Sequence, residues 1–451
     1  MKIYGLDKST IVDALTSGRV TVAVYGLGKM GLPLAAVFAD KGGRVIGVDD
    51  NQKVVDEINS GGCPVLGEPG LSDMLKKNIA AERFWATSEG VAAAREADVM
   101  VVLVPCLLNR DKSPDLAAVT KVCSDISQGL CKGDFVILET TVPPRTTRDI
   151  LQPILKQSGL REGDFGLAFC PERTASGRAI RDITGSYRKV VGGIDKQSTR
   201  TAEAIYSVIN KKGVLAVSDS TTAETVKVFE GIYRDVNIAL ANELAMVCKE
   251  LVVDSAEVFK VANEPLNEET GRPYTNLLQS GAGVGGHCIP VYPYFIIKTT
   301  DTDTALTKTA RKKNKSMPRY MLNLIVEGLN EIEKSVEGSN VLILGLAFRD
   351  GVKEFRNSPA IPIIRGLKKL KASVYLYDPL FSSEEIKSFG VKPSDGFDSM
   401  DCLVIVTDHK EFKGYDWREI GGQMRSKVIV DGRQVVPSEK VRNLGFIYKG
   451  I

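Results

Sequence analysis

Short apolar runs punctuate the first half of the chain, and segments of helical or mixed pattern separate them. The runs lie at Val20–Tyr25, Arg44–Val48, Val99–Val104, Phe135–Glu139, Phe165–Phe169 and Val214–Val217. Strand-length runs that alternate with helical segments are typical of a parallel, doubly wound sheet. We therefore expect the chain to begin with an α/β domain.

Beyond Ser218 the apolar spacing becomes helical. Residues recur three and four positions apart at Val226, Phe229, Tyr233, Val236, Leu240, Leu244 and Val247. Thr221 and Glu224 fit a capping box just before this stripe. The pattern predicts one helix of about 28 residues. More helical sequence continues to about Val261 and, after a glycine-rich loop, through Lys334.

A glycine motif follows the first predicted strand. Gly26, Gly28 and Gly31 form a G-x-G-x-x-G turn that contains Lys29 and Met30, and Asp49 closes the second predicted strand. In such a turn the first glycine makes the bend, the second admits a pyrophosphate, and the third lets the helix pack closely. The helix N-terminus then binds the phosphates. The acid favours NAD, because a carboxylate accepts a hydrogen bond from a ribose 2′-OH and repels a 2′-phosphate.

The α/β pattern restarts near the C-terminus. Strands are expected at Asn340–Phe348, Ser373–Asp378, Asp401–Thr407 and Lys427–Asp431, with a helix over Pro359–Lys369. At 451 residues the chain exceeds one core. We expect an α/β fold of two Rossmann-like, doubly wound domains joined by a central all-helical domain with one long helix. The expected boundaries are 1–218 for NAD binding, 219–318 for the helical domain and 319–451 for the second α/β domain.

Composition narrows the class of protein. Charged residues at 25% and hydrophobic residues at 43% are ordinary globular values, and the net charge of +3 gives no argument for a nucleic-acid partner. No apolar run exceeds strand length, so we expect a cytoplasmic protein without a membrane partner. Eight cysteines lack C-x-x-C pairs, which fits reduced thiols. His287 and His409 are the only histidines, which excludes a histidine-rich metal site, and we expect no metal.

One cysteine lies in an unusual loop. The segment Ser280–Pro290 presents Cys288 after Gly281, Gly283, Gly285 and Gly286. Four glycines in six positions indicate positive φ or a close ligand approach. Cys288 is therefore a candidate nucleophile, and the alternative is a tight turn that leads to an ordinary buried thiol.

Motifs along nearly the whole chain resemble the UDP-glucose/GDP-mannose dehydrogenase family. In the family's order they are Gly26–Pro33, Val104-Pro105, Glu139–Pro143, Cys170–Arg173, Ala223–Lys227, Arg234–Leu244, Gly283–Cys288, Gly345–Phe348, Arg356–Pro359 and Asp431–Arg433. The resemblance implies an NAD-dependent, four-electron oxidation of the C6 hydroxymethyl of a UDP-sugar to a UDP-uronic acid, which would feed polysaccharide or glycan synthesis. It also implies a homodimer or higher homo-oligomer through the central helix.

The resemblance assigns roles to particular residues. Cys288 would attack the aldehyde to form a thiohemiacetal and then a thioester. Lys227 would donate to the oxyanions, Glu172 would act as base for the hydrolytic water, and Thr141 would position that water. Further cofactor contacts are implied at Pro105, Thr141 and Arg356. The implied substrate contacts are Glu172, Arg173, Lys227, Arg272, Gly285, Arg349 and Arg433. Arg272 could also be an ordinary surface charge.

Two positions depart from the family pattern. An Asn four residues after the lysine is Gly231 here, and an Asp four residues after the cysteine is Tyr292. These departures keep open a catalytically weak nucleotide-sugar binding protein. A 3-hydroxyacid dehydrogenase is a third alternative, which would need Lys227 but not Cys288. Pro171-Glu172-Arg173 resembles the subgroup that acts on UDP-N-acetylhexosamines, UDP-N-acetyl-D-mannosamine in particular, and the alternative substrate is UDP-glucose.

Overall fold

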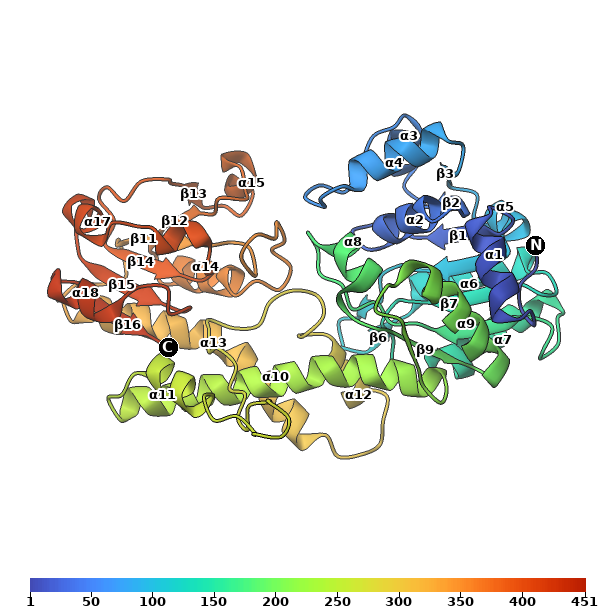
Figure 1. The fold of residues 1–451 in the computed structure, drawn as a ribbon. Coiled ribbons are helices and arrows are strands. Elements are labelled where there is room, and N and C mark those ends of the chain that lie inside the picture. Colours follow the sequence, from blue (N-terminus) through green and yellow to red (C-terminus); the bar gives the residue numbers. More distant parts are fainter. The chain divides into compact units, whose positions relative to one another are not determined.

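Two α/β sheets carry the chain, one in each half of the sequence (Figure 1). The computed structural model describes residues 1–451. Its contacts divide the chain into two units: Met1–Glu230 with Tyr294–Thr300, and Gly231–Pro293 with Asp301–Ile451. The division into three domains expected from the sequence stays a prediction.

The first unit contains an eight-stranded sheet. Its order is β10-β9-β8-β7-β4-β1-β2-β3. The strands are β1 (Thr21–Tyr25), β2 (Arg44–Val48), β3 (Phe84–Thr87), β4 (Val99–Val102), β7 (Phe135–Leu138), β8 (Gly166–Phe169), β9 (Lys189–Gly193) and β10 (Val214–Ala216). Strands β5 (Leu107–Leu108) and β6 (Pro114–Asp115) form a separate small hairpin.

Helices cover both faces of this sheet, as a doubly wound fold requires. Along β1, Val22 and Val24 belong to one hydrophobic cluster, whereas Ala23 and Tyr25 belong to another. The helices are α1 (Lys8–Thr16), α2 (Gly31–Asp40), α3 (Gln52–Asn59), α4 (Leu71–Ala80), α5 (Gly90–Glu96), α6 (Ala117–Gly129), α7 (Gln152–Leu155) and α9 (Lys196–Ile209). Every residue of β1 is buried, which explains its continuous apolar run.

The expectation of a fully parallel sheet is wrong for two strands, because β10 runs parallel to the reversed strand β9. β9 runs antiparallel to β8, with Phe169 opposite Gly192. A parallel return needs a crossover element across the sheet face. The connection here holds only α8 (Ala179–Arg181) and one π-helical turn (Asp182–Ser186), so the chain returns beside β8 in the opposite direction. The sequence also gave no prediction for β3 or β9.

The long helix is confirmed, but its predicted cap is wrong. Helix α10 runs over Ser220–Glu250, 31 residues. The Asp219 carboxylate, not Thr221, accepts from the first turn, at Thr222 N (2.8 Å). Glu224 instead accepts from the backbone N–H groups of Arg145 (2.6 Å) and Thr147 (2.8 Å). Tertiary donors therefore replace the local capping box.

The second unit contains a six-stranded, fully parallel sheet in the order β13-β12-β11-β14-β15-β16. The strands are β11 (Asn340–Leu344), β12 (Ser373–Tyr377), β13 (Lys392–Pro393), β14 (Cys402–Ile405), β15 (Val428–Asp431) and β16 (Ile447–Gly450). Its helices include α11 (Ser255–Ala262), α13 (Ala305–Asn330), α14 (Ala360–Lys369), α15 (Ser383–Lys387), α16 (Lys410–Lys413), α17 (Trp417–Gln423) and α18 (Ser438–Asn443). Helix α12 (Tyr292–Ile297) begins in this unit. None of the helices in the structure is long and apolar enough to cross a membrane.

Candidate active site

The glycine turn after β1 has the shape that the sequence predicts. Gly26 has φ +96°, and a Cβ there would lie 2.6 Å from the Leu103 carbonyl oxygen. A Cβ on Gly31, the first residue of α2, would collide with the Gly26 carbonyl. In contrast, no atom lies within 4 Å of the position that a Gly28 Cβ would take. The turn is therefore tight at its first and third glycines and open at the second, where a pyrophosphate approaches.

The carboxyl ends of the neighbouring strands meet beside this turn. Asp49 follows β2 and accepts from the N–H groups of Leu27 (2.9 Å) and Asn51 (3.0 Å). Pro105 follows β4, and Thr141 follows β7. The strand order reverses between β1 and β4, and ligands of open α/β sheets bind at such a switch point. The structure thus brings the predicted cofactor residues of the first unit to one edge.

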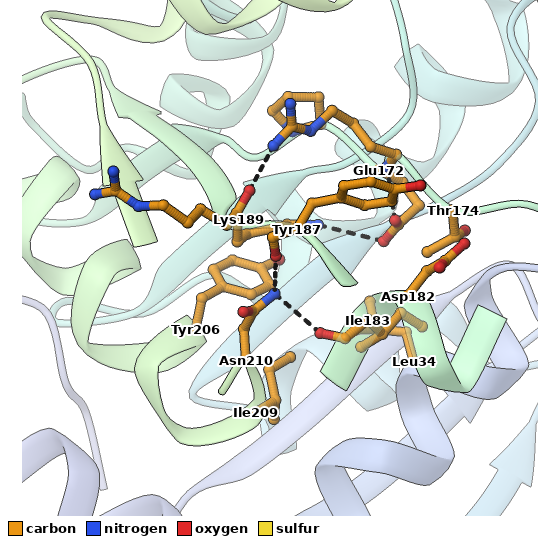
Figure 2. A pocket seen from close by; sticks show the side chains of 13 residues that line it. Leu34, Glu172, Thr174, Asp182, Ile183, Tyr187, Lys189, Tyr206, Ile209 and Asn210 are labelled. Carbon is orange, nitrogen blue, oxygen red and sulfur yellow. Dashed lines mark hydrogen bonds and ion pairs between the residues drawn. The ribbon is translucent and has the colours of Figure 1, made fainter. Parts of the chain in front are cut away.

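Glu172 lies in a pocket with partners that the sequence did not indicate (Figure 2). Lys189 Nζ lies 3.3 Å from Glu172 Oε2 and 3.0 Å from Glu139 Oε1. The Tyr206 hydroxyl donates to Glu139 Oε1. Glu139 follows β7 inside the Glu139–Pro143 motif, but a carboxylate just after a strand gives no signal of its own.

The two carboxyls have opposite pKa shifts. Burial and the nearby charge of Glu172 raise the pKa of Glu139 to about 8, against the effect of Lys189. Burial also acts to raise the pKa of Glu172, but the charge of Lys189, a hydrogen bond with Glu139 and the charge of Lys227 together hold that pKa below its usual value. Lys227 of α10 is therefore close enough to Glu172 to stabilise its charge.

Arg173 extends this group of charges toward α10. Its backbone N–H donates to Glu172 Oε1 (2.7 Å), and its Nη1 lies 3.0 Å from Glu230 Oε1. Glu230 follows Lys227 by three residues, so both lie on one side of α10. Thr174, further along the same loop, donates to Met30 Sδ at 2.7 Å, which ties the Glu172 loop to the glycine turn.

Glycine is required before Cys288 for two different reasons, a positive φ angle and the close approach of neighbouring side chains. Gly283 and Gly286 have φ +143° and +83°. A Cβ on Gly281 would lie 2.8 Å from Arg433 Nη1, and one on Gly285 would lie 2.5 Å from Phe348 Cβ. The close approaches that the glycines permit are therefore made by protein groups of the second unit, rather than by a ligand alone.

Backbone bonds hold the same loop against the second sheet. Gly286 N donates to the Arg356 carbonyl (2.8 Å), and the Asn357 amide donates to the Gly286 carbonyl (2.8 Å). Ala282 N donates to the Gly432 carbonyl at 3.1 Å. The Cys288 loop is thus fixed beside Arg356 and Arg433, which the sequence predicted as cofactor and substrate contacts.

His287 and Tyr292 both form hydrogen bonds with Cys288. A hydrogen bond with the Cys288 side chain raises the pKa of His287. Tyr292 begins α12, and its N–H donates to the Cys288 carbonyl (3.0 Å). Sequence reasoning missed His287, whose only signal is its place before the cysteine.

The two departures from the family pattern are one structural feature. A Cβ on Gly231 would lie 2.5 Å from Tyr292 Cδ2 and 3.3 Å from Tyr292 Cγ. The tyrosine ring therefore packs on the helix backbone where any side chain at position 231 would stand. Gly231 and Tyr292 are sterically coupled.

Arg433 has the character of an anion-binding side chain. It is largely buried and forms one ion pair, from Nη2 to Asp408 Oδ1 (3.0 Å). Its buried Nε has no hydrogen-bond partner. Burying an unsatisfied donor is costly, so a phosphate oxygen at this edge would stabilise it.

The remaining predicted residues differ in setting. Arg349 lies over the Phe348 ring, 5.7 Å from its centroid. Arg356 and Arg272 are exposed, and Arg272 lies in the loop between α11 and the Cys288 segment. No contact brings Arg272 to the other predicted residues, so its role stays a prediction.

Family models match three consecutive parts of the chain. Residues 20–210 match the NAD binding domain, residues 221–316 the central domain and residues 342–438 the UDP binding domain of the UDP-glucose/GDP-mannose dehydrogenase family. The chain belongs to this family and is an NAD-dependent nucleotide-sugar dehydrogenase. The open Gly28 turn fits NAD, and the unsatisfied Arg433 fits a UDP-sugar.

Individual relatives span nearly the full length. UDP-N-acetyl-D-mannosamine dehydrogenase of Pyrococcus horikoshii is 34% identical, with 95% of this chain and 98% of that protein covered. A solved structure of UDP-D-ManNAc dehydrogenase from that organism has a TM-score of 0.85 at 32% identity, covering 96% of this chain and 99% of that one. A UDP-glucose dehydrogenase of Pyrobaculum islandicum has a TM-score of 0.82 at 27% identity, covering 96% and 97%. These full-length matches are to nucleotide-sugar dehydrogenases, which argues against the 3-hydroxyacid dehydrogenase alternative.

Proposed function

We propose that the protein oxidises the C6 hydroxymethyl of a UDP-N-acetylhexosamine, UDP-N-acetyl-D-mannosamine in particular, to the corresponding UDP-uronic acid. The observation that carries the proposal is the Cys288 loop, whose glycines accommodate Arg433 and Phe348 of the UDP-binding part. The loop that presents the thiol therefore packs directly against the arginine that would bind the diphosphate. The name of the Pyrococcus relative supports the N-acetylmannosamine sugar.

Cys288 and Lys227 divide the oxidation steps between them. The Cys288 sulfur adds to the C6 aldehyde and gives a thiohemiacetal, and oxidation of that species leaves a thioester. Lys227 donates a hydrogen bond to the oxyanion of each tetrahedral species. Bound NAD⁺ supplies the two-electron acceptor for each of the two oxidations.

Glu172 and Thr141 serve the hydrolysis that follows. Water adds to the thioester carbonyl and its proton passes to Glu172, while the C–S bond breaks and Cys288 leaves as the thiolate. The depressed pKa of Glu172 keeps it able to accept that proton at neutral pH. Thr141 orients the water.

Substrate recognition uses arginines and one glycine. Arg433 holds the diphosphate through its guanidinium, with Arg349 as a second cation, and Arg173 and Gly285 contact the sugar side. Arg356 contributes to the cofactor pyrophosphate. Arg272 would reach the substrate of a neighbouring subunit.

A cytoplasmic homodimer would be formed through α10. Four large apolar residues on this helix stay more than 40% exposed: Phe229 (55%), Tyr233 (55%), Leu240 (44%) and Val247 (45%). With Val236 and Leu244 they continue a three-and-four spacing, which is the pattern of a helix that packs against a second helix. The dimer would cover this stripe with the same stripe of a second copy.

Trapping the covalent intermediate tests the mechanism. The Glu172→Gln variant, incubated with UDP-N-acetyl-D-mannosamine and NAD⁺, should accumulate a sugar adduct on Cys288, measured by intact-protein and peptide mass spectrometry. Cys288→Ala should form no acid and no adduct while it still binds NAD⁺, because the thiol acts only after the first oxidation. Acid formation by Cys288→Ala would place the nucleophile elsewhere.

A further inference from the structure

Four side chains form a buried polar cluster around the predicted base: Glu139, Glu172, Lys189 and Tyr206, here called the Glu139 cluster. Glu139 and Lys189 are 1% and 9% exposed. Glu172 is also largely buried, with 12% of its side chain exposed. Three ionisable groups thus share a space where water screens their charges little.

The antiparallel strand β9 is what delivers the lysine. Lys189 is the first residue of β9. Because β9 runs against β8, its first residue lies at the carboxyl edge of the sheet, where Glu139 follows β7 and Glu172 follows β8. In a parallel β9 the same residue would lie at the opposite edge. The strand direction therefore places an ammonium group between two carboxyls.

The charges of the cluster do not balance if both acids are ionised. Two carboxylates and one ammonium leave a net negative charge in a buried site, and adjacent carboxyls in such sites share a proton. Protonation of one acid makes the cluster neutral. The two acids differ in which can better carry that proton.

The contacts favour Glu139 as the protonated acid. Its Oε2 is buried and accepts from no N–H or O–H group, so a negative charge on Glu139 would be poorly satisfied there. A hydrogen bond between the two carboxyls also raises the pKa of Glu139 and lowers that of Glu172, which makes Glu139 the donor. Its Oε1 accepts from Tyr206, which a neutral carbonyl oxygen also does. Lys189 lies near both acids, 3.0 Å from Glu139 Oε1 and 3.3 Å from Glu172 Oε2, but Glu172 also accepts from the Arg173 N–H (2.7 Å) and is stabilised by the charge of Lys227.

Two other titratable groups lie beside Glu139, the thiol of Cys170 and the hydroxyl of Tyr206. Burial raises the pKa of Cys170 well above its usual value, so the thiol stays neutral. Burial and the charge of Glu139 likewise raise the pKa of Tyr206. Neither group therefore supplies a charge that would compete for Lys189.

We propose that Glu139 is the neutral, protonated member of this cluster at neutral pH, so that Lys189 is left to pair with Glu172. Glu139 and Lys189 are then positioning residues, which keep Glu172 a carboxylate for the hydrolytic step. The functional half of this inference rests on the proposed role of Glu172. The protonation pattern itself does not.

Infrared difference spectroscopy of the whole protein between about pH 6 and pH 9.5 tests the protonation pattern. The parent should show a protonated-carboxyl band that is lost as pH rises through about 8. Glu139→Gln should lack this band. Glu224→Gln is the matched control, because Glu224 is a second buried carboxyl, with a pKa that burial raises to about 7, and this variant should keep the Glu139 band. If Glu139→Gln still shows a protonated-carboxyl band that is lost near pH 8, the assignment is wrong. It is also wrong if the parent shows no such band.

Kinetics tests the consequence for Glu172. Lys189→Met should raise the acid-side apparent pKa of NADH release by about one to three units, because an ion-pair partner shifts a carboxyl by that amount. Lys189→Arg should restore the parent profile. A uniform loss of rate in Lys189→Met, without a shifted profile, would show a merely structural role and contradict the inference. If no UDP-sugar is oxidised, the proposed function fails, but the infrared result still decides the state of Glu139.

Discussion

At the scale of single residues, the site depends on positions where a side chain would collide, as well as on contacts between side chains. Gly26 and Gly31 are required because a Cβ would collide with backbone, whereas Gly28 faces open space. The sequence predicted this turn because each glycine has a local role in a short motif. It could not predict Glu139, Lys189 or His287 as partners, because each depends on strands or loops that only the fold brings together.

Glu139 should make folding stability depend on pH. Its folded pKa of about 8 lies above the usual value of 4.5, so the native state holds a proton that the unfolded state releases. Stability contributed in this way is complete below about pH 4.5 and is lost progressively as the pH rises to about 8. Thermal melts of Glu139→Gln from pH 5 to 8.5 should show a shallower decline than the parent, and equal slopes would contradict the assignment.

Gly231 and Tyr292 should behave as a coupled pair. Gly231→Asn places a Cβ about 2.5 Å from the tyrosine ring, so the variant should lose about 1–3 kcal/mol of stability. Tyr292→Ala should relieve that collision, so urea unfolding of the two single variants and the double variant should give a coupling energy of about 0.5–3 kcal/mol. The control is Gly422→Asn, at a helical glycine with no atom near its Cβ position, which should change stability little. Additive effects at 231 and 292 would contradict the steric account.

At the scale of helices and strands, a continuous apolar run decides which strands the sequence predicts. Strands β1, β2, β4, β7 and β8 are buried throughout or nearly so and were predicted from their apolar runs. β3 has an alternating burial pattern over four residues, and β9 begins with a lysine and ends in two glycines. Both are therefore weak signals. The capping box of α10 failed because Glu224 has tertiary donors, which a local motif does not reveal.

Helix α10 should control the oligomeric state. Leu240→Glu places a charge in the exposed apolar stripe, so it should convert a dimer to a monomer, measured by size-exclusion chromatography with light scattering. Val252→Glu is the control, because Val252 is 91% exposed beyond the end of α10 and outside the stripe. A monomeric parent, or a Leu240→Glu variant of unchanged mass, would rule out this interface.

At the scale of the whole molecule, the two sheets have one feature in common, an aspartate that supports the turn after the first strand. Asp49 after β2 accepts from Leu27 N, and Asp378 after β12 accepts from Leu346 N (2.7 Å), so in each unit an acid supports the turn after the first strand. The two units differ in the partners of this aspartate. In the second unit His409 also lies 3.1 Å from Asp378, whereas Asp49 receives only the two backbone donors.

The preference for NAD⁺ over NADP⁺ should depend on the charge of Asp49. Asp49→Asn keeps an acceptor for the Leu27 N–H but removes the charge that would repel a 2′-phosphate. The preference for NAD⁺ over NADP⁺ in kcat/KM should fall about tenfold or more, equal to about 1.4 kcal/mol. Comparable kcat/KM for the two cofactors in the parent protein would contradict the role of Asp49.

A four-electron oxidation of a UDP-N-acetylhexosamine releases two NADH for each sugar, so the product stoichiometry distinguishes it from a two-electron oxidation. The parent protein is given limiting UDP-N-acetyl-D-mannosamine, UDP-N-acetyl-D-glucosamine or UDP-glucose with excess NAD⁺, and the NADH released per sugar consumed is counted. We expect two NADH per UDP-N-acetyl-D-mannosamine, with the highest kcat/KM for that substrate and the UDP-uronic acid as product. One NADH per sugar with an aldehyde product, or a preference for UDP-glucose, would contradict the account.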